Sequence, residues 1–224
     1  MPAAQDAVPV VPRISTVLFD LDGTLTDSAA GIIDSYRYAL GKLGLQAGDG
    51  AIRACIGPPI HAGLCSLGVP EDKMEDAIFL YREYFSVTGI FANRLYEGVG
   101  AMLQELRARG RALGVATAKP EPYAKTILDH FGVARYFDAV SGSSFGGRLL
   151  DKVEIVSHAL DLLGGPASAG VAMVGDREHD MYAARRLGLA AIGATWGYGT
   201  EEELLGAGAQ ALAASPAEVA GLLG

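Results

Sequence analysis

Short apolar runs alternate with longer segments of helical periodicity along most of the chain. The apolar runs predict buried strands at residues 17–19, 112–116, 136–140, 171–174 and 189–192. Helical patterns cover residues 28–43, 101–109, 122–131, 152–163 and 179–187, with a last helix after Ser215. Strands that alternate with helices in this way indicate a parallel sheet covered by helices, and therefore an α/β fold.

Residues 48–92 interrupt the alternation, because they contain several helical patterns and no convincing strand. This interruption predicts a helical module inserted after the first strand. We expect a Rossmann-like parallel-sheet core formed by residues 14–26 and 96–224, and a helical cap domain formed by residues 27–95. Residues 1–13 are rich in alanine and proline, and we expect a flexible tail there.

Composition and charge narrow the classes of function. The net charge is −8 and no cluster of Lys and Arg is visible, so we expect no nucleic-acid partner. No apolar stretch reaches the ~18 residues that a membrane span needs, and the first residues lack the features of a secretory signal. The two cysteines show no disulfide or metal-ligand pattern. We therefore expect a soluble, cytoplasmic protein, as a monomer or small homo-oligomer.

The end of the first apolar run carries the most informative polar residues, Asp20 and Asp22, followed by Gly23. Residues two apart near a strand end can point to one side, and open α/β sheets bind ligands at the carboxyl ends of their strands. Two adjacent carboxylates repel each other unless a cation, a shared proton or a substrate compensates. An ordinary polar turn is the alternative, since Asp and Gly are common turn residues. The pair predicts a functional site once further partners are found.

Three later segments place polar residues at comparable positions. Thr117 ends a strand before a helix whose N-terminus suits an anion, although for this residue taken alone a helix cap is the favoured interpretation. Lys152 opens a helix against the helix dipole, which favours a role in neutralising an anion over an exposed surface role. One interpretation of Asp176 and Asp180 is that they cap a helix and have no other role. Together with Asp20 and Asp22, however, they would form an oxygen-rich pocket suited to Mg²⁺.

These segments together resemble a known family. Asp20-Leu21-Asp22-Gly23-Thr24-Leu25, Thr117, Lys152 and the segment from Gly175-Asp176 to Asp180 look like the four motifs of the haloacid-dehalogenase-like hydrolase superfamily, in the same order. The resemblance covers essentially residues 14–224. The Gly-Asp-Arg-Glu-His-Asp and Thr-Ala-Lys-Pro segments look most like the phosphoglycolate-phosphatase-like branch, which includes members named 5′-nucleotidases.

The resemblance implies a Mg²⁺-dependent phosphatase that hydrolyses a small phosphorylated metabolite through an aspartyl-phosphate intermediate. Asp20 would be the nucleophile, and Asp22 the general acid and then the base. The groups that bind the phosphoryl oxygens would be Gly23, Thr117, Ala118 and Lys152. The magnesium ligands would be Asp20, the backbone carbonyl of Asp22, Asp176 and, in support, Asp180.

Residues 27–95 resemble the cap of this superfamily, with hinges near residues 26–27 and 93–96. The Ile-Gly-Pro-Pro-Ile segment at residues 56–60 looks like a substrate-facing cap loop. Four residues are candidates to contact the substrate: Arg53, His61, Arg94 and Lys119. For Arg53, His61 and Arg94 a plain surface or packing role is at least an equal alternative, and Lys119 could simply open the loop at Pro120.

The sequence leaves several functions open. A 5′-nucleotidase is the first alternative, followed by a sugar-phosphate mutase and a non-catalytic metabolite-binding protein on the same fold. A dehalogenase is disfavoured because Asp22 is followed by Gly-Thr. A phosphonate hydrolase would need a cap lysine, and neither Lys42 nor Lys73 lies in a motif. The sequence does not name the phosphomonoester.

Overall fold

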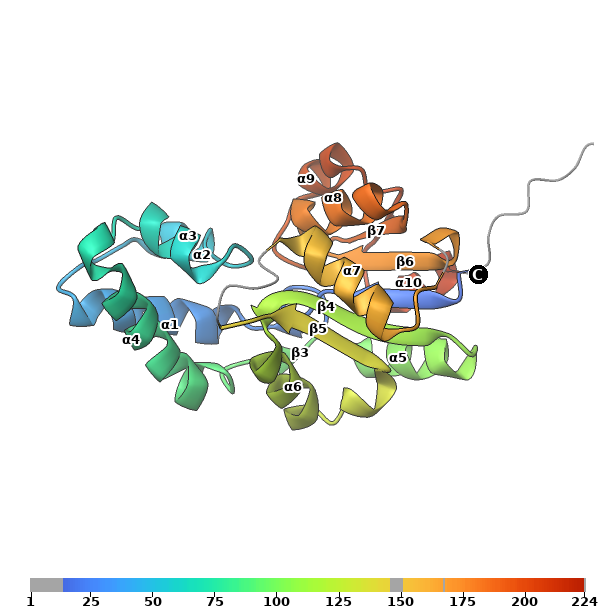
Figure 1. Ribbon diagram of the computed structural model, residues 1–224, viewed down its shortest axis with the longest axis horizontal. Coiled ribbons are helices and arrows are strands. Elements are labelled where there is room, and N and C mark those ends of the chain that lie inside the picture. The colour runs from blue at the N-terminus through green and yellow to red at the C-terminus, as the bar shows by residue number, and fades with distance from the viewer. Residues whose placement is uncertain (1–13, 146–150, 167, 224) are drawn as a thin grey trace, which may run out of the picture.

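A six-stranded parallel sheet forms the centre of the molecule (Figure 1). The computed structural model describes residues 14–145, 151–166 and 168–223. Every neighbouring pair of strands is parallel, in the order β5-β4-β1-β6-β7-β8. The strands are β1 (Thr16–Phe19), β4 (Ala112–Pro120), β5 (Ala139–Ser143), β6 (Val171–Gly175), β7 (Ala190–Ala194) and β8 (Ala211–Ala213). The predicted α/β, Rossmann-like fold class is confirmed.

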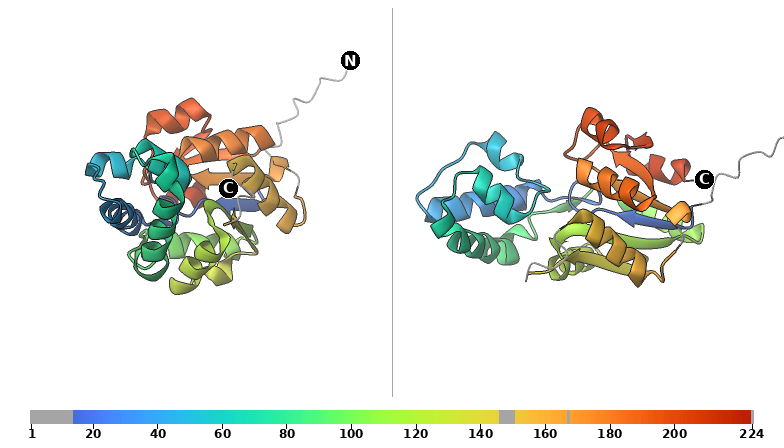
Figure 2. Two further views of the ribbon diagram at one scale, coloured as in Figure 1. Left: turned by 60° about the vertical axis from the view of Figure 1, so that its left-hand side comes forward. Right: turned by 45° about the horizontal axis from the view of Figure 1, so that its top comes forward.

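Helices cover both faces of this sheet, which explains why its strands are continuously apolar. In β1, Val17 and Phe19 pack into one buried cluster and Leu18 packs into the other. Figures 1 and 2 show one set of helices on the side of the sheet opposite to α8 and α9. That set includes α5 (Val99–Ala108) and α6 (Glu121–His130), and α5 contacts α10 (Pro216–Leu222). The other face carries α7 (Lys152–Leu162), α8 (Glu178–Leu187) and α9 (Glu201–Ala207).

A group of helices between β1 and α5 lies beside the sheet, and we refer to it as the helical unit (Figure 1). Its elements are α1 (Ala29–Lys42), α2 (Asp49–Arg53), α3 (Ile60–Ser66), the 3₁₀ turn η1 (Glu71–Lys73), α4 (Met74–Tyr84) and the π-helical turn η2 (Phe85–Gly89). Helix α1 packs against α4. Two short strands, β2 (Thr26–Asp27) and β3 (Arg94–Leu95), pair in antiparallel fashion where the chain enters and leaves the unit. The division into separate cap and core domains stays a prediction.

Several predicted element boundaries differ from the structure. The strand predicted at residues 136–140 begins at Ala139, because Ala134–Tyr136 forms a 3₁₀ turn. Phe137, which suggested a strand, packs edge-on against the ring of Phe19 with 6.5 Å between centroids. Helix α9 and strand β8 were not predicted, since they lie in an Ala- and Gly-rich region with little periodicity.

Two other predictions concern the ends of the chain and membranes. The predicted flexible tail, residues 1–13, lies outside the described residues. Within the described ranges, the helices are all too short or too polar to cross a membrane.

Candidate active site

The site residues converge because they follow neighbouring strands of the sheet. Asp20 comes directly after β1, Thr117 lies in β4, and Asp176 comes directly after β6. Strands β4 and β6 flank β1 on its two sides, so their carboxyl ends meet at one edge. Strand β4 is longer than predicted, and the Thr117 hydroxyl accepts a hydrogen bond from the Lys119 N–H at 3.2 Å.

Lys152 lies at the centre of the charged groups. Its ammonium is 2.6 Å from Asp20 Oδ1 and 2.7 Å from Asp180 Oδ1. It begins α7, as predicted, and Asp151 caps that helix by accepting a hydrogen bond from the Val153 N–H at 2.6 Å. Burial lowers the pKa of the Lys152 ammonium, but the two carboxylates outweigh burial and raise this pKa above its usual range. Lys152 is therefore a permanent positive charge in the site.

Two carboxyl groups of the site hold their protons more tightly than usual. Burial, with repulsion from Asp180 and Asp22, raises the pKa of Asp20 to about 6 despite the nearby Lys152. Burial, followed by repulsion from Asp20 and Asp180, also raises the pKa of Asp176 well above its usual range. The Asp176 carboxylate accepts hydrogen bonds from the Thr24 hydroxyl at 2.9 Å and the Tyr198 N–H at 2.8 Å. The raised pKa values of Asp20 and Asp176 thus reflect burial first and repulsion among the carboxylates second.

The chemistry of this cluster fits a divalent cation. Oxygens of Asp20, Asp176 and Asp180 lie within 4.8 Å of one another, and all three residues are buried. Three carboxylates face one ammonium, Lys152, which leaves two negative charges when all are ionised. One divalent cation neutralises that charge, and a hard cation such as Mg²⁺ prefers oxygen ligands of this kind. The side chain of Asp22 lies outside this trio.

Two glycines allow the chain to pack directly against the aspartates. Gly23 has a positive φ of 91°, and a Cβ there would lie 2.1 Å from Asp176 Oδ2. A Cβ on Gly175 would lie 2.2 Å from Asp180 Cγ. The Gly23 N–H, which we expected to face the phosphate, donates to the Thr26 carbonyl at 2.7 Å. The close packing accounts for the glycines in both motifs.

Asp22 forms a second charged pair, with Lys119. The Lys119 ammonium is 3.0 Å from Asp22 Oδ2, and both side chains are largely buried. The same ammonium lies 4.5 Å from the centroid of the Phe85 ring, which belongs to the helical unit. Asp22 Oδ1 is buried and has no hydrogen-bond partner within the described ranges. Asp22 thus keeps one oxygen free to meet a ligand.

A cavity of about 480 Å³ opens over these groups, between the sheet and the helical unit. Its lining includes Asp20, Asp22, Thr117, Ala118, Lys119, Lys152 and Asp180 on the side of the sheet. Of the four candidate substrate residues, His61 and Lys119 line this cavity. Arg53 and Arg94 line a second hollow, near Trp196, and Arg94 pairs with Asp27 at 2.7 Å.

The structure also identifies cavity residues that the sequence analysis missed. Among the residues that line the cavity are Tyr36, Tyr81, Phe85, Tyr123 and Arg82. Most of them belong to amphipathic helices, and their spacing is the same as that of ordinary core residues. The periodicity alone therefore could not distinguish a cavity wall from a core.

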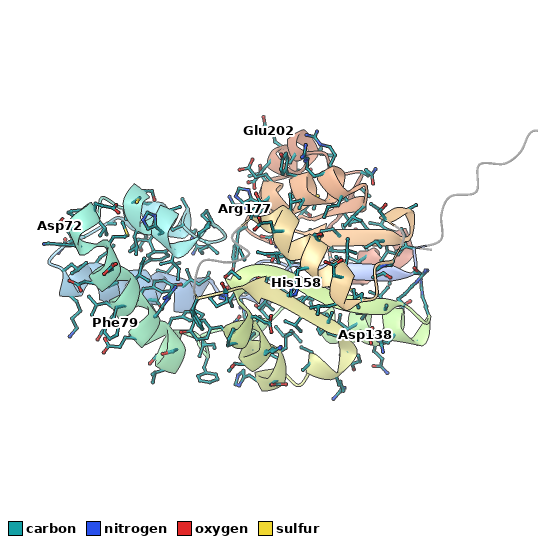
Figure 3. The ribbon with its side chains drawn as sticks, in the orientation of Figure 1. Asp72, Phe79, Asp138, His158, Arg177 and Glu202 are labelled. Carbon is teal, nitrogen blue, oxygen red and sulfur yellow. The ribbon has the colours of Figure 1, made fainter. Side chains whose placement is uncertain are left out.

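Arg177 connects the two sides of the cavity. It follows Asp176 and donates hydrogen bonds to the Ile56 carbonyl at 2.7 Å and to Glu203 Oε1 at 2.8 Å. Ile56 begins the segment that resembled a cap loop, and the residues that follow it line the cavity. Figure 3 shows Arg177 at the end of the sheet region that faces the helical unit.

Known proteins resemble this chain over most of its length. A family model described as haloacid dehalogenase-like hydrolase matches residues 17–194. The tyrosine-protein kinase PtkA of Mycobacterium tuberculosis is 43% identical over 184 residues, which is 82% of this chain and 62% of PtkA. The chain thus spans less than two thirds of PtkA. A 5′-nucleotidase of Pseudomonas aeruginosa is 42% identical over 194 residues, which cover 86% of this chain and 87% of that protein.

A solved structure and a phosphoglycolate phosphatase also resemble this chain. The crystal structure of a predicted phosphatase from Clostridium acetobutylicum has a TM-score of 0.88 and 40% identity, covering 94% of this chain and 98% of that one. The phosphoglycolate phosphatase of Yersinia pseudotuberculosis is 32% identical over 200 residues, 85% of each chain. The resemblance inferred from the four motifs is confirmed, including its branch. On this agreement of motifs, fold and relatives, the chain belongs to the haloacid dehalogenase-like hydrolase family.

Proposed function

We propose that this protein is a Mg²⁺-dependent phosphatase of small phosphomonoesters that works through a phosphorylated Asp20. One observation carries the proposal: Asp20 lies on the wall of a cavity, 2.6 Å from Lys152, in a cluster with Asp176 and Asp180. Phosphoryl transfer requires alignment and charge stabilisation more than covalent chemistry, and this cluster supplies both. The phosphatases among the relatives support the same activity.

Asp20 acts as the nucleophile. Its carboxylate attacks phosphorus, the bond from phosphorus to the leaving oxygen breaks, and the phosphoryl group stays on Asp20. Lys152 holds Asp20 by its Oδ1 atom, so that the other carboxylate oxygen is available for attack. Lys152 also offsets the charge that builds up on the phosphoryl oxygens, together with the Thr117 hydroxyl and the backbone at Ala118.

Asp22 moves the proton in both halves of the reaction. Its free Oδ1 atom gives a proton to the leaving oxygen, and then takes one from the water that releases phosphate from Asp20. The pair with Lys119 at 3.0 Å holds the Asp22 side chain by its Oδ2 atom, which leaves Oδ1 for the proton transfer.

Asp20, the Asp22 carbonyl and Asp176 would hold Mg²⁺, with Asp180 in support. When bound, Mg²⁺ neutralises the excess charge of the carboxylates and stabilises the phosphoryl oxygens in the transition state. The trio of buried carboxylates supports this assignment, since the Lys152 ammonium offsets only one of their three charges.

Two substrates are candidates, and the cavity distinguishes them. Phosphoglycolate, the substrate in the name of one group of relatives, has a two-carbon leaving group that would fill little of a cavity of about 480 Å³. A nucleoside 5′-monophosphate, as in the name of another relative, is larger and has a flat base that suits the aromatic walls. The size and lining of the cavity favour this second candidate.

The test is phosphate release from a panel of phosphomonoesters, with Mg²⁺ and with chelator, for the wild type and Asp20→Asn. We expect release that requires both Mg²⁺ and Asp20, with acid-quenched enzyme carrying phosphate on Asp20 by mass spectrometry. A parallel incubation with ATP and tyrosine-containing peptides tests the activity named for PtkA. Phosphotyrosine formation without release of phosphate from any monoester would overturn the proposal.

A further inference from the structure

Arg82 differs from the other cations of the cavity wall. Lys119, Lys152 and Arg177 also line the cavity, and each pairs with a carboxylate at 3.0 Å or less. Arg82 has no ion pair and no hydrogen bond to any described residue, and its Nε atom is buried without a partner. Arg82 is therefore the cavity arginine whose charge the described protein leaves uncompensated.

An unpaired guanidinium such as that of Arg82 is unfavourable unless a hydrogen-bond acceptor from a ligand pairs with it. A partly buried guanidinium without an acceptor loses hydration and gains no hydrogen bond in return. The guanidinium carbon of Arg82 lies 5.1 Å from the centroid of the Phe145 ring. A ring face attracts the charge but accepts no strong N–H bond in the plane of the guanidinium, so the donors remain available.

A row of aromatic rings extends from the helical unit to Phe145, the ring that Arg82 contacts. The rings are those of Tyr36, Tyr81, Phe85, Tyr123 and Phe145, with successive centroids 4.8, 5.8, 5.3 and 5.1 Å apart. The first four line the cavity. Lys119 lies over one ring of the row, Phe85, and Arg82 lies over another, Phe145. The part of the row from Phe85 through Tyr123 to Phe145 therefore connects the lysine that pairs with Asp22 to the unpaired arginine.

We propose that Arg82 is a substrate-binding residue that recognises an oxygen acceptor on the leaving group, and that the leaving group carries a flat ring bearing this acceptor. The aromatic row provides the surface on which a flat ring packs. The guanidinium provides parallel N–H donors that match a carboxylate or a ring carbonyl. This inference rests on the proposed phosphatase function and narrows its substrates to ring-containing phosphomonoesters with an oxygen acceptor remote from the phosphate.

The test compares two substrates that differ only in the acceptor, phenyl phosphate and 4-carboxyphenyl phosphate, with phosphoglycolate as the ring-free arm. We expect the wild type to prefer 4-carboxyphenyl phosphate by roughly tenfold or more in kcat/KM, as for one charge-assisted hydrogen bond. Arg82→Met should remove this preference, because it should raise KM for the carboxylated substrate by a much larger factor than KM for phenyl phosphate. Arg82→Lys keeps the charge but loses the planar donors, so it should retain part of the preference for 4-carboxyphenyl phosphate.

Arg135→Met is the matched control, because Arg135 lies over the Tyr136 ring at 4.9 Å but is exposed and outside the cavity. It should keep the full preference. Equal preference in the wild type and Arg82→Met, or no preference in the wild type, would overturn the inference. A circular dichroism melt of each variant separates loss of binding from loss of folding.

A binding measurement separates failure of this inference from failure of the proposed function. Isothermal titration with 4-hydroxybenzoate, the leaving group itself, reports on Arg82 without turnover. We expect binding to the wild type and to Arg135→Met, and loss of binding in Arg82→Met. Loss of binding in Arg82→Met without any phosphate release would overturn the phosphatase proposal and leave Arg82 as a ligand-binding residue. Equal binding by all three proteins would overturn the assignment of Arg82.

Discussion

The two sides of the cavity between the sheet and the helical unit differ in how their charged side chains are paired. On the side of the sheet, each lysine contacts a carboxylate: Lys152 contacts Asp20 and Asp180, and Lys119 contacts Asp22. On the side of the helical unit, the wall is mostly apolar, with three aromatic rings, and Arg82 forms no ion pair with any described residue. In the proposed phosphatase, the sheet side handles the phosphoryl group that all substrates share. The side of the helical unit is suited to contact the leaving group, which differs from one substrate to another.

The two sides of the cavity therefore depend on different interactions: charge compensation at the sheet edge, and packing on the side of the helical unit. The charges at the sheet edge are mutually dependent, because removing one leaves another buried and uncompensated. The aromatic wall depends on shape and packing, which tolerate substitution more gradually. Changes at the sheet edge should therefore affect the rate for every substrate, and changes on the helical side should affect the choice among substrates.

The largest effect is expected for Asp20→Asn. Losing the nucleophile should lower kcat by roughly 10⁴-fold or more for every substrate of the panel, while the protein stays folded. Phosphate release and a thermal melt measure the two properties. Asp34→Asn is the control, since Asp34 is a surface residue that pairs with Arg37 at 3.0 Å. A folded Asp20→Asn protein with near wild-type activity would refute the role of nucleophile.

The next effect is expected for Lys152→Ala. This change removes the ammonium that offsets charge on the phosphoryl oxygens, so we expect a loss of about 2–4 kcal/mol of transition-state stabilisation. The loss should be similar for substrates with and without a ring, because Lys152 lies on the sheet side. Lys125→Ala, which breaks an exposed pair with Glu121, should leave kcat unchanged. A loss confined to one substrate would contradict the division between the two sides.

A smaller effect is expected from Mg²⁺ and pH together. The pKa of Asp20 is 3.8 in its ordinary state and about 6 in the metal-free fold, so the folded protein binds this proton more tightly. The contribution of Asp20 to metal-free stability is therefore present at low pH and is lost as pH rises through about 4 to 6. Mg²⁺ must displace the same proton, so metal stabilisation should grow with pH.

Thermal melts with Mg²⁺ and with chelator measure this linkage. At about a hundredfold excess over its Kd, Mg²⁺ should stabilise the protein by about 2.7 kcal/mol near neutral pH, and by less near pH ~5. Asp176→Asn should weaken the Mg²⁺ effect, since Asp176 belongs to the carboxylate cluster. An equal Mg²⁺ effect at both pH values would contradict the assignment of these carboxylates as ligands.

The smallest effect is expected for Arg94→Gln. Arg94 was a candidate substrate residue, but it lines the second hollow and its side chain is 77% exposed. Breaking its surface pair with Asp27 should change the Tm little, and kcat and KM should stay at the wild-type values for every substrate. A rise in KM comparable to that of Arg82→Met would show that Arg94 reaches the substrate.

The sequence predicted the sheet side of the site better than the helical side, for a physical reason. Asp20 and Asp176 follow apolar strands, and Lys152 begins a helix. The carboxyl ends of neighbouring parallel strands meet at one edge of the sheet, independently of how the helical unit packs. Tyr81, Arg82 and Phe85 belong to α4 and η2, and only the packed structure shows which face of these helices meets the cavity. The ion pair between Lys119 and Asp22 is likewise a tertiary contact, across residues far apart in the sequence.

The paired strands β2 and β3 have a consequence for how such a protein can change over time. Thr26 pairs with Leu95 and Asp27 with Arg94, so the chain leaves and re-enters the core at adjacent points. Insertions are tolerated best where their two ends lie close together, because the host structure is then not pulled apart. In the predicted division into cap and core, the helical unit can thus be lengthened or exchanged while the sheet below keeps its register. Evolution can revise the preference for a substrate without rebuilding the chemistry.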